Sequence, residues 1–156
     1  MARATRRSSR GRSGAAVPFE YVEHTADVAL RGIGETPEDA FVEAARAMWN
    51  LMVDLDAIAP RESLRIERSA VRLDLLLVEW LSALLAEKDI SGLFFSRFCV
   101  SIVPQGGGHR LDGEAWGERL DSTRHSTKLE VKGISYLGLR VVLEKDQWVA
   151  QCVVDV

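Results

Sequence analysis

The sequence predicts an α+β fold, a two-layer sandwich in which a mainly antiparallel sheet carries two amphipathic helices packed on one face. Two segments, residues 37–54 and 73–91, have apolar residues at helical spacing. The second half of the chain consists of short strand-like segments separated by turns, which is typical of β-hairpins. Strand and helix patterns do not alternate one for one, so a parallel α/β arrangement is disfavoured.

The first element is an interrupted strand. Phe19 and Tyr21 alternate with acidic residues, and the extended pattern resumes at Val28 and continues to Ile33. Between these ends lies His24-Thr25-Ala26-Asp27, which does not fit a strand pattern. The sequence therefore predicts a turn that carries a histidine and an aspartate.

The first helix has a clear start signal. Thr36 is an N-cap residue, Pro37 suits the first helical position, and Asp39 is a short substitute for the glutamate of a capping box. The helix is expected to end near Asp54. Its apolar face consists of Ala40, Phe41, Ala44, Ala45, Met48 and Met52.

A strand with one solvated face, residues 60–69, precedes the second helix. The second helix has the strongest apolar periodicity in the chain, and Ser91-Gly92 is expected to end it. Its apolar residues are Leu73, Leu76, Leu77, Trp80, Leu81, Leu84 and Leu85.

The rest of the chain is predicted to be β-structure. The sequence Pro104–Gly108 forms a loop between two strands, and Glu144–Gln147 forms the turn before the last strand. The expected strands are Leu93–Val103, Arg110–Leu120, Lys128–Ile134, Leu137–Leu143 and Trp148–Val156.

Charge divides the chain into a basic tail, residues 1–17, and an acidic body, residues 18–156. The tail contains five of the 20 basic residues and none of the 23 acidic ones, so the body carries a formal charge of about −8. The body has the length of a single domain. The tail is expected to be a disordered, solvated extension, with an RNA-contacting arm as the alternative. An acidic body argues against a broad nucleic-acid-binding face.

Composition also predicts where the protein works. No apolar run approaches the roughly 18–20 residues that span a bilayer, and the tail lacks the apolar stretch of a secretory signal. We therefore expect a cytoplasmic protein with no membrane partner. Cys99 and Cys152 lie in apolar strand-like runs without metal or redox spacing, which predicts a core role for both.

Several catalytic motifs are missing. The glycines of Gly106–Gly108 precede a strand instead of a helix, so they indicate a hairpin loop and not a phosphate-binding loop. His24, His109 and His125 have no zinc-ligand spacing. Nothing in the sequence supports a Ser-His-Asp triad, although such triads are defined by geometry and not by spacing.

The carboxylates near the chain's C-terminal residues indicate a possible metal site. Asp155 lies in the last strand and is followed by the α-carboxylate of Val156. If the first and last strands end at the same rim, Asp27 joins them. Clustered carboxylates repel each other unless a cation lies between them, and oxygen ligands favour Ca²⁺ or Mg²⁺.

On the residues alone, a structural explanation is favoured over a metal site, because isolated aspartates at turns are common. Asp155 would then simply end a strand, and Asp27 would be an ordinary turn residue. His24 would hydrogen-bond the backbone of its own turn. Lys132 would lie on the solvated side of a half-buried strand.

The order of motifs along the chain resembles the archease family. The sequence Glu23-His24-Thr25-Ala26-Asp27 follows an aromatic strand, and Glu130-Val131-Lys132 precedes Tyr136. The chain ends in Val-Asp-Val. The other matching segments are Gly34 to Phe41, Trp116-Gly117-Glu118, Arg124-His125 and Trp148-Val149-Ala150. The resemblance covers about Phe19 to Val156, with Leu129 and Gly133 departing from the family pattern beside Lys132.

This resemblance implies a function. Archeases are small α+β accessory proteins that activate RtcB-type RNA ligases in tRNA splicing and RNA repair. They promote guanylylation of the ligase and allow multiple turnover, and they are not ligases themselves. The RNA would be contacted indirectly, through the ligase.

The resemblance also implies site residues. Asp27, Asp155 and Val156 would hold a divalent metal ion, Ca²⁺ or Mg²⁺, with Ca²⁺ favoured in the isolated protein. Lys132 would be functionally important. His24 would order the turn instead of ligating the metal, because a hard cation prefers oxygen. Asp54 also occupies a family-like position.

Two other function classes remain open. A stand-alone metal-dependent hydrolase would use Asp27 and Asp155 to activate water, and would turn over phosphoesters without a partner. A chaperone-like binding module would suppress the aggregation of unrelated proteins without a metal. The sequence offers neither a catalytic base nor an exposed apolar patch for these alternatives.

Overall fold

The computed structural model describes residues 27–156, which form six strands, two α-helices and one short 3-10 helix. The predicted tail, the first part of the interrupted strand and His24 lie outside the described residues. The elements in chain order are β1 (Asp27–Gly34), α1 (Pro37–Met52), η2 (Leu55–Ala57), β2 (Glu62–Ala70), α2 (Leu73–Ser91), β3 (Leu93–Gln105), β4 (Gly108–Arg119), β5 (Gly133–Glu144) and β6 (Gln147–Asp155).

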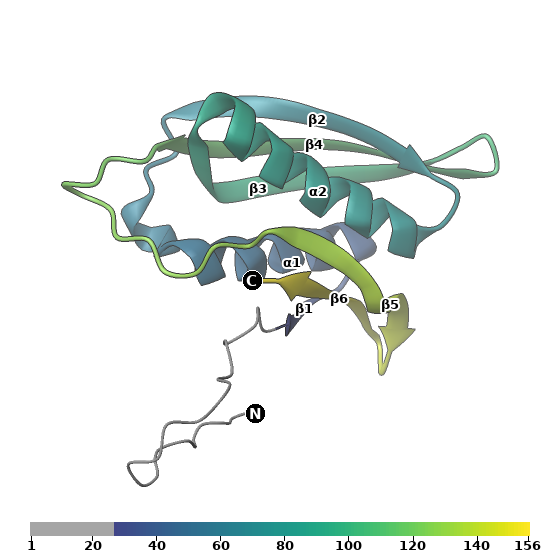
Figure 1. Ribbon diagram of the computed structural model, residues 1–156. Helices are drawn as coiled ribbons and strands as arrows, with labels where there is room; N and C mark the ends of the chain where they lie inside the picture. The colour runs from purple at the N-terminus through teal and green to yellow at the C-terminus, as the bar shows by residue number, and fades with distance from the viewer. Residues whose placement is uncertain (1–26) are drawn as a thin grey trace, which may run out of the picture.

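The strands form two antiparallel three-stranded sheets, with the orders β1-β6-β5 and β2-β4-β3. Figure 1 shows the second sheet in the upper part of the view and the first in the lower part, with α1 running between them. The predicted α+β class, with two helices and antiparallel strands, is confirmed. The strands divide into two sheets because β5 pairs with β6 and not with β4.

Each helix contacts both sheets. The helix α1 packs against β1 and β6 of one sheet and β3 of the other, and α2 packs mainly against β2, β4 and β5. This explains why the apolar residues of α2 extend over more than one narrow face. One face of each sheet is therefore turned toward the helices and the core.

The start of α1 forms as predicted. Thr36 has extended backbone angles, and its hydroxyl accepts a hydrogen bond from the Asp39 N–H at 3.0 Å. Pro37 occupies the first turn, where a missing N–H costs nothing. The helix ends at Met52, slightly before the predicted Asp54.

Aromatic side chains fill the centre of the core. Trp80 is fully buried, and its Nε1–H donates to the carbonyl oxygen of Phe41 at 3.2 Å, which ties α2 to α1. Trp49 packs edge-on against Phe94 and Phe95 of β3, with ring centroids 5.6 and 5.2 Å apart. These contacts fix both helices relative to the sheet β2-β4-β3.

The predicted ends of α2 and of the β3–β4 loop are also observed. Gly92 ends α2 with a φ of 77°, a left-handed conformation that favours glycine. Gly106 and Gly107 both have positive φ and form the tight turn between β3 and β4. The glycine run is therefore a hairpin turn.

The strand predicted over Lys128–Ile134 is wrong for residues 128–132, whereas Gly133 and Ile134 belong to β5. The N–H groups of Lys128 and Leu129 donate to the carbonyl oxygens of Met52 and Leu51, at 2.8 and 3.0 Å, so this segment bonds to the end of α1. Regular pairing begins only at Gly133, where β5 starts and extends to Glu144 as one element. Val131 is buried between the exposed residues Glu130 and Lys132. This produces an alternating pattern although the segment is not a strand.

The prediction for the two cysteines is half right. Cys152 is fully buried between the helices and the first sheet, and burial raises the pKa of its thiol to about 12. Cys99 is exposed, because its register opposite Glu114 places it on the face of β3 that is turned away from the helices. Within residues 27–156, no helix is long and apolar enough to cross a membrane.

Candidate functional site: an acidic pair at the end of a sheet

The structure brings Asp27 and Asp155 together. Asp27 is the first residue of β1, Asp155 is the last residue of β6, and they lie directly opposite each other in the antiparallel register. Residues opposite each other in such a ladder have Cβ atoms about 4.5–5.5 Å apart on the same face. Both aspartates are exposed. We call them the acidic pair.

The acidic pair faces away from the helices. Leu30, Cys152 and Val154 are buried and occupy the inward face of this sheet. Asp27 and Asp155 alternate with these residues and so lie on the outward face. Their carboxylates are therefore available to a ligand or partner that approaches the sheet from outside.

Lys132 adjoins the acidic pair through its backbone. Its N–H donates to the carbonyl oxygen of Asp155 at 2.7 Å, and the next residue, Gly133, pairs with Asp155 in the ladder. Asp155 is therefore held from both sides, by β1 and by β5. The Lys132 side chain is exposed beside it, and Val156 is half-buried against the core.

Asp54 lies at the same end of the molecule. Gly32 packs so closely on α1 that a Cβ there would lie 2.3 Å from the Ala44 nitrogen. Asp27 lies five residues before Gly32, which is about 16 Å along an extended strand. The helix α1 runs in the opposite direction, and its eight residues after Ala44 cover about 12 Å before it ends at Met52. Asp54 follows two residues later and therefore lies near the level of Asp27.

The chemistry of the acidic pair suits a hard cation, although the pair alone is not a complete site. Among residues 27–156, no group donates a hydrogen bond to either carboxylate. Yet in this part of the chain no group of three or more His, Cys, Asp or Glu side chains is placed to hold a metal ion. Calcium and magnesium take six or more oxygen ligands, so further oxygens, such as those of water and Val156, would have to contribute.

A second acidic centre, which sequence reasoning missed, surrounds Glu118 at the end of β4. Its side chain is only 4% exposed. Four donors surround the carboxylate: the Ala59 N–H at 2.7 Å, Arg61 Nε at 3.2 Å, Arg124 Nη2 at 2.9 Å and His125 Nε2 at 3.1 Å. We call these residues the Glu118 cluster.

These contacts set the charge of Glu118. The hydrogen bond from Arg124, followed by that from the Ala59 N–H, lowers the pKa of Glu118 to about 2, and His125 acts in the same direction. Burial of the carboxylate opposes this effect. Glu118 is therefore ionised throughout the physiological pH range.

His125 is part of the support and not a catalytic base. Its Nδ1 accepts a hydrogen bond from the Asp121 N–H at 2.9 Å, so the proton of the neutral ring resides on Nε2 and points to Glu118. The side chain is only 1% exposed and cannot reach a substrate. In the sequence, Glu118, Arg124 and His125 stand out only as parts of motifs shared with the archease family. Those motifs did not indicate that the three side chains form a cluster.

A segment of the chain connects the Glu118 cluster with the acidic pair. The cluster fixes residues 121–125, and Thr127 forms an isolated bridge with Val53 at the end of α1. The segment continues to Lys132, whose N–H bonds to Asp155. The cluster thus anchors the start of the connection that delivers Lys132 to the acidic pair.

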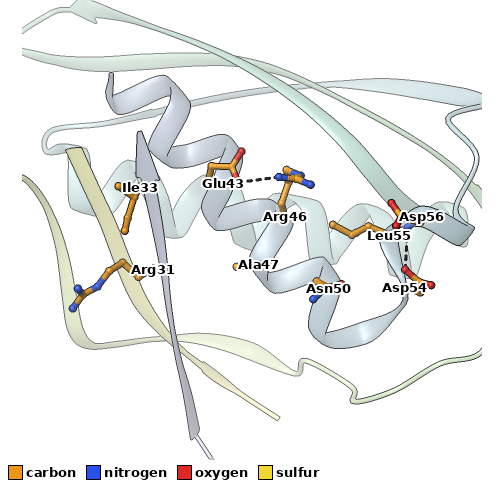
Figure 2. A pocket seen from close by; sticks show the side chains of 9 residues that line it. All are labelled: Arg31, Ile33, Glu43, Arg46, Ala47, Asn50, Asp54, Leu55 and Asp56. Atoms are coloured by element: carbon orange, nitrogen blue, oxygen red, sulfur yellow. Dashed lines mark hydrogen bonds and ion pairs between the residues drawn. The ribbon is translucent and has the colours of Figure 1, made fainter. Parts of the chain in front are cut away.

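A groove of about 500 Å³ lies between β1 and the exposed side of α1. Figure 2 shows Arg31 and Ile33 projecting from β1, with Glu43 and Arg46 forming an ion pair on α1. The charges in the groove are mixed, so it does not define a ligand class. Its lining consists of Arg31, Ile33, Glu43, Arg46, Ala47, Asn50, Asp54, Leu55 and Asp56.

The fold and the acidic pair define a class of small α+β proteins in which two antiparallel sheets enclose two helices and a strand end presents exposed carboxylates. Residues 19–156 match the Archease protein family, and the chain belongs to this family. It is 42% identical to the protein archease of Methanopyrus kandleri, over 89% of this chain and 99% of that one. Identity to the protein archease of Thermococcus gammatolerans is 40%, over 88% and 97% of the two chains.

Solved structures agree with this assignment. The solution structure of Methanobacterium thermoautotrophicum protein 1598 is similar with a TM-score of 0.76 and 30% identity, over 86% of this chain and 96% of that one. The crystal structure of an archease, described as a possible chaperone, from Thermotoga maritima has a TM-score of 0.58. At 18% identity, over 91% and 100% of the two chains, the latter likeness shows the fold alone.

Proposed function

We propose that this protein is a non-catalytic accessory protein that activates an RtcB-type RNA ligase. It promotes guanylylation of the ligase and multiple turnover in tRNA splicing and RNA repair, and meets RNA through the ligase in the cytoplasm. Family membership supports this function. The observation that carries it is the exposed pairing of Asp27 with Asp155, two residues from opposite ends of the described chain.

The acidic pair would act by holding a divalent cation at the surface that meets the ligase. Asp27, Asp155 and the Val156 carboxylate would be its protein ligands, with Ca²⁺ or Mg²⁺ as the ion. When bound, the ion supplies positive charge that can offset nucleotide phosphate charge. The residues of this chain keep the two carboxylates aligned on neighbouring strands and turned toward the partner.

Two further residues would support this arrangement. Lys132 places a mobile positive charge beside the acidic pair, where it would contact the ligase or its nucleotide. Its backbone also fixes the position of Asp155. His24 would order the turn that leads into Asp27.

The test is multiple-turnover RNA ligation by the cognate RtcB-type ligase, with and without this protein. Wild type, Asp27→Ala and Asp155→Ala are compared with Asp89→Ala, an exposed aspartate on α2 that serves as a matched control. Stimulation by wild type and Asp89→Ala, and none by the other two variants, is expected. Absence of stimulation by wild type would contradict the proposed function, and full stimulation by both site variants would contradict the site.

A chaperone-like binding module is the second candidate. Exposed apolar side chains, including Tyr136 and Leu137, favour binding to proteins. Suppression of the aggregation of unrelated proteins, unaffected by chelators, would support this candidate over ligase activation. Turnover of phosphoesters by the isolated protein, lost in Asp27→Ala, would instead identify a metal-dependent hydrolase.

A further inference from the structure

The strand β5 leaves the ladder with β6 between Ser135 and Arg140. Ser135 pairs with Val153 and Arg140 pairs with Gln151, so five steps along β5 match two steps along β6. Three extra residues are therefore accommodated in an irregular segment. We call residues 135–140 the knuckle. Its Tyr136 and Leu137 are 65% and 69% exposed.

The backbone of the knuckle is held in one shape. The Leu137 N–H donates to the hydroxyl oxygen of Ser135 at 3.0 Å. Gly138 has a φ of 68°, which glycine adopts without strain. The Gly138 carbonyl oxygen accepts a hydrogen bond from Gln151 Nε2 at 3.1 Å. Local and cross-strand hydrogen bonds thus fix both sides of the protruding residues.

The Gln151 anchor is itself oriented from the opposite edge of the sheet. Its Oε1 accepts from Arg31 Nε at 3.1 Å and from Arg31 Nη2 at 2.8 Å. The second contact assigns the amide orientation, because Nε2 is left to donate to Gly138. Side chains from β1 and β6 therefore position a turn in β5.

The fixed and exposed position of these two side chains favours the binding of a partner. Burying a tyrosine or a leucine in an apolar pocket is favourable, and a preorganised backbone reduces the entropy lost on binding. Aromatic residues held at an interface centre are common binding hot spots. Since nothing among residues 27–156 covers Tyr136 and Leu137, the burial is available to a partner.

The knuckle lies on the same sheet as the acidic pair. Asp155 is two residues from Val153 and four from Gln151 along β6, so the knuckle is about 7–13 Å along the strand from Asp155. A partner that covers the acidic pair from the outward face therefore reaches the knuckle without crossing a helix.

We propose that Tyr136 and Leu137 insert into an apolar pocket of the protein partner and anchor it so that its surface covers the acidic pair. The inference rests on the proposed function, in which that partner is the RtcB-type ligase. A protein fits this surface better than RNA does. The aliphatic Leu137 offers RNA no stacking face, and Asp27 and Asp155 repel phosphates.

The experiment measures the affinity of the purified cognate ligase for this protein by biolayer interferometry. The double variant Tyr136→Ala/Leu137→Ala is compared with Leu143→Ala, which truncates a 59% exposed leucine of the same strand outside the knuckle. The double variant is expected to weaken binding by about 10-fold or more. Leu143→Ala is expected to leave the affinity unchanged. Gln151→Leu, which removes the anchor of Gly138, should give a smaller loss.

Calcium affinity and thermal unfolding are measured on the same variants. The double variant should keep both the wild-type calcium affinity and the wild-type Tm, because its side chains are exposed. Equal binding of wild type and double variant would overturn the role proposed for the knuckle, and so would equal losses in the double variant and Leu143→Ala. Neither result would contradict the proposed function. Wild type that fails to bind the ligase would overturn both. RNA binding by the isolated protein that the double variant abolishes would also overturn the inference.

Discussion

The carboxylates of the two acidic regions of this protein have opposite environments. Glu118 is almost fully buried and is surrounded by four donors from its own chain. Asp27 and Asp155 are exposed and lie opposite each other, and no group in residues 27–156 donates to them. A carboxylate saturated by internal donors serves the fold, whereas carboxylates left without donors are available to something outside it.

The comparison also shows why a shifted pKa does not by itself identify the candidate site. A strongly shifted pKa often marks an active site, but ion-pair networks that support a structure produce the same signal. Glu118 has the shifted pKa and Asp27 has the exposed position. Accessibility therefore decides between them, and the two regions should respond differently to substitution.

The largest effect on folding is expected from Glu118→Gln. The amide keeps the shape of the side chain but removes the charge that Arg61 and Arg124 face, and its NH₂ group confronts donors. We expect a clear fall in Tm by calorimetry. Glu114→Gln, at a half-buried position four residues earlier in β4, is the matched control and should leave Tm nearly unchanged. Equal Tm values for both variants would contradict the conclusion that the Glu118 cluster stabilises the fold.

The next largest effect is expected at the acidic pair and concerns binding only. Asp155→Asn removes one charge without changing the side-chain shape and should weaken Ca²⁺ binding by about 10-fold or more, measured by titration calorimetry. Tm should not fall, because the substitution relieves repulsion with Asp27. A variant with unchanged calcium affinity but lower Tm would reverse the roles assigned to the two regions.

Acid should destabilise the protein through Glu118. The folded-state pKa of Glu118, about 2, lies below its ordinary value of 4.5. Its contribution to stability is therefore complete above about pH 4.5 and is lost as the pH falls toward 2. Hydrogen bonds from Thr123 lower the pKa of Asp121 as well and act in the same direction.

Urea unfolding between pH 5 and pH 3 measures this dependence. The free energy of unfolding of wild type should decrease over this range, and that of Glu118→Gln should decrease less. Parallel curves for the two proteins would show that other groups control the acid response.

The smallest effects are expected from the arginines around Glu118. Arg61 is 68% exposed and makes one contact to the carboxylate, whereas Arg124 is 48% exposed and also pairs with Asp121. Solvent screens exposed ion pairs, so Arg61→Ala should change Tm little and Arg124→Ala somewhat more. The reverse order in calorimetry would contradict this ranking, because Arg124 has both the lower exposure and the shorter contact to Glu118, 2.9 Å against 3.2 Å for Arg61.

Sequence reasoning predicted most of the elements because their signals are local. Thr36, Pro37 and Gly92 act through the backbone next to them, and the apolar periodicity of residues 73–91 needs no distant partner. Segment 128–132 was misassigned for the opposite reason. Its hydrogen bonds go to the end of α1, more than 70 residues earlier in the chain, and alternation cannot reveal that.

The acidic pair could be predicted only in part. The position of Asp27 before one strand and Asp155 at the end of another indicated a shared rim, and the register confirms that they meet. Their role with a metal ion remains a prediction. The Glu118 cluster escaped because its donors come from residues 59–61 and 124–125, and only folding brings these segments to β4.

The central place of β6 in its sheet has a consequence for how the protein is made. Both β1 and β5 pair with β6, so β1 leaves the ribosome long before its neighbour exists. Asp27 and Asp155 are 128 residues apart in the chain. Pairs this distant in sequence close late and slowly. A nascent chain can build the sheet β2-β4-β3 first, but the acidic pair can form only after β6 has been made.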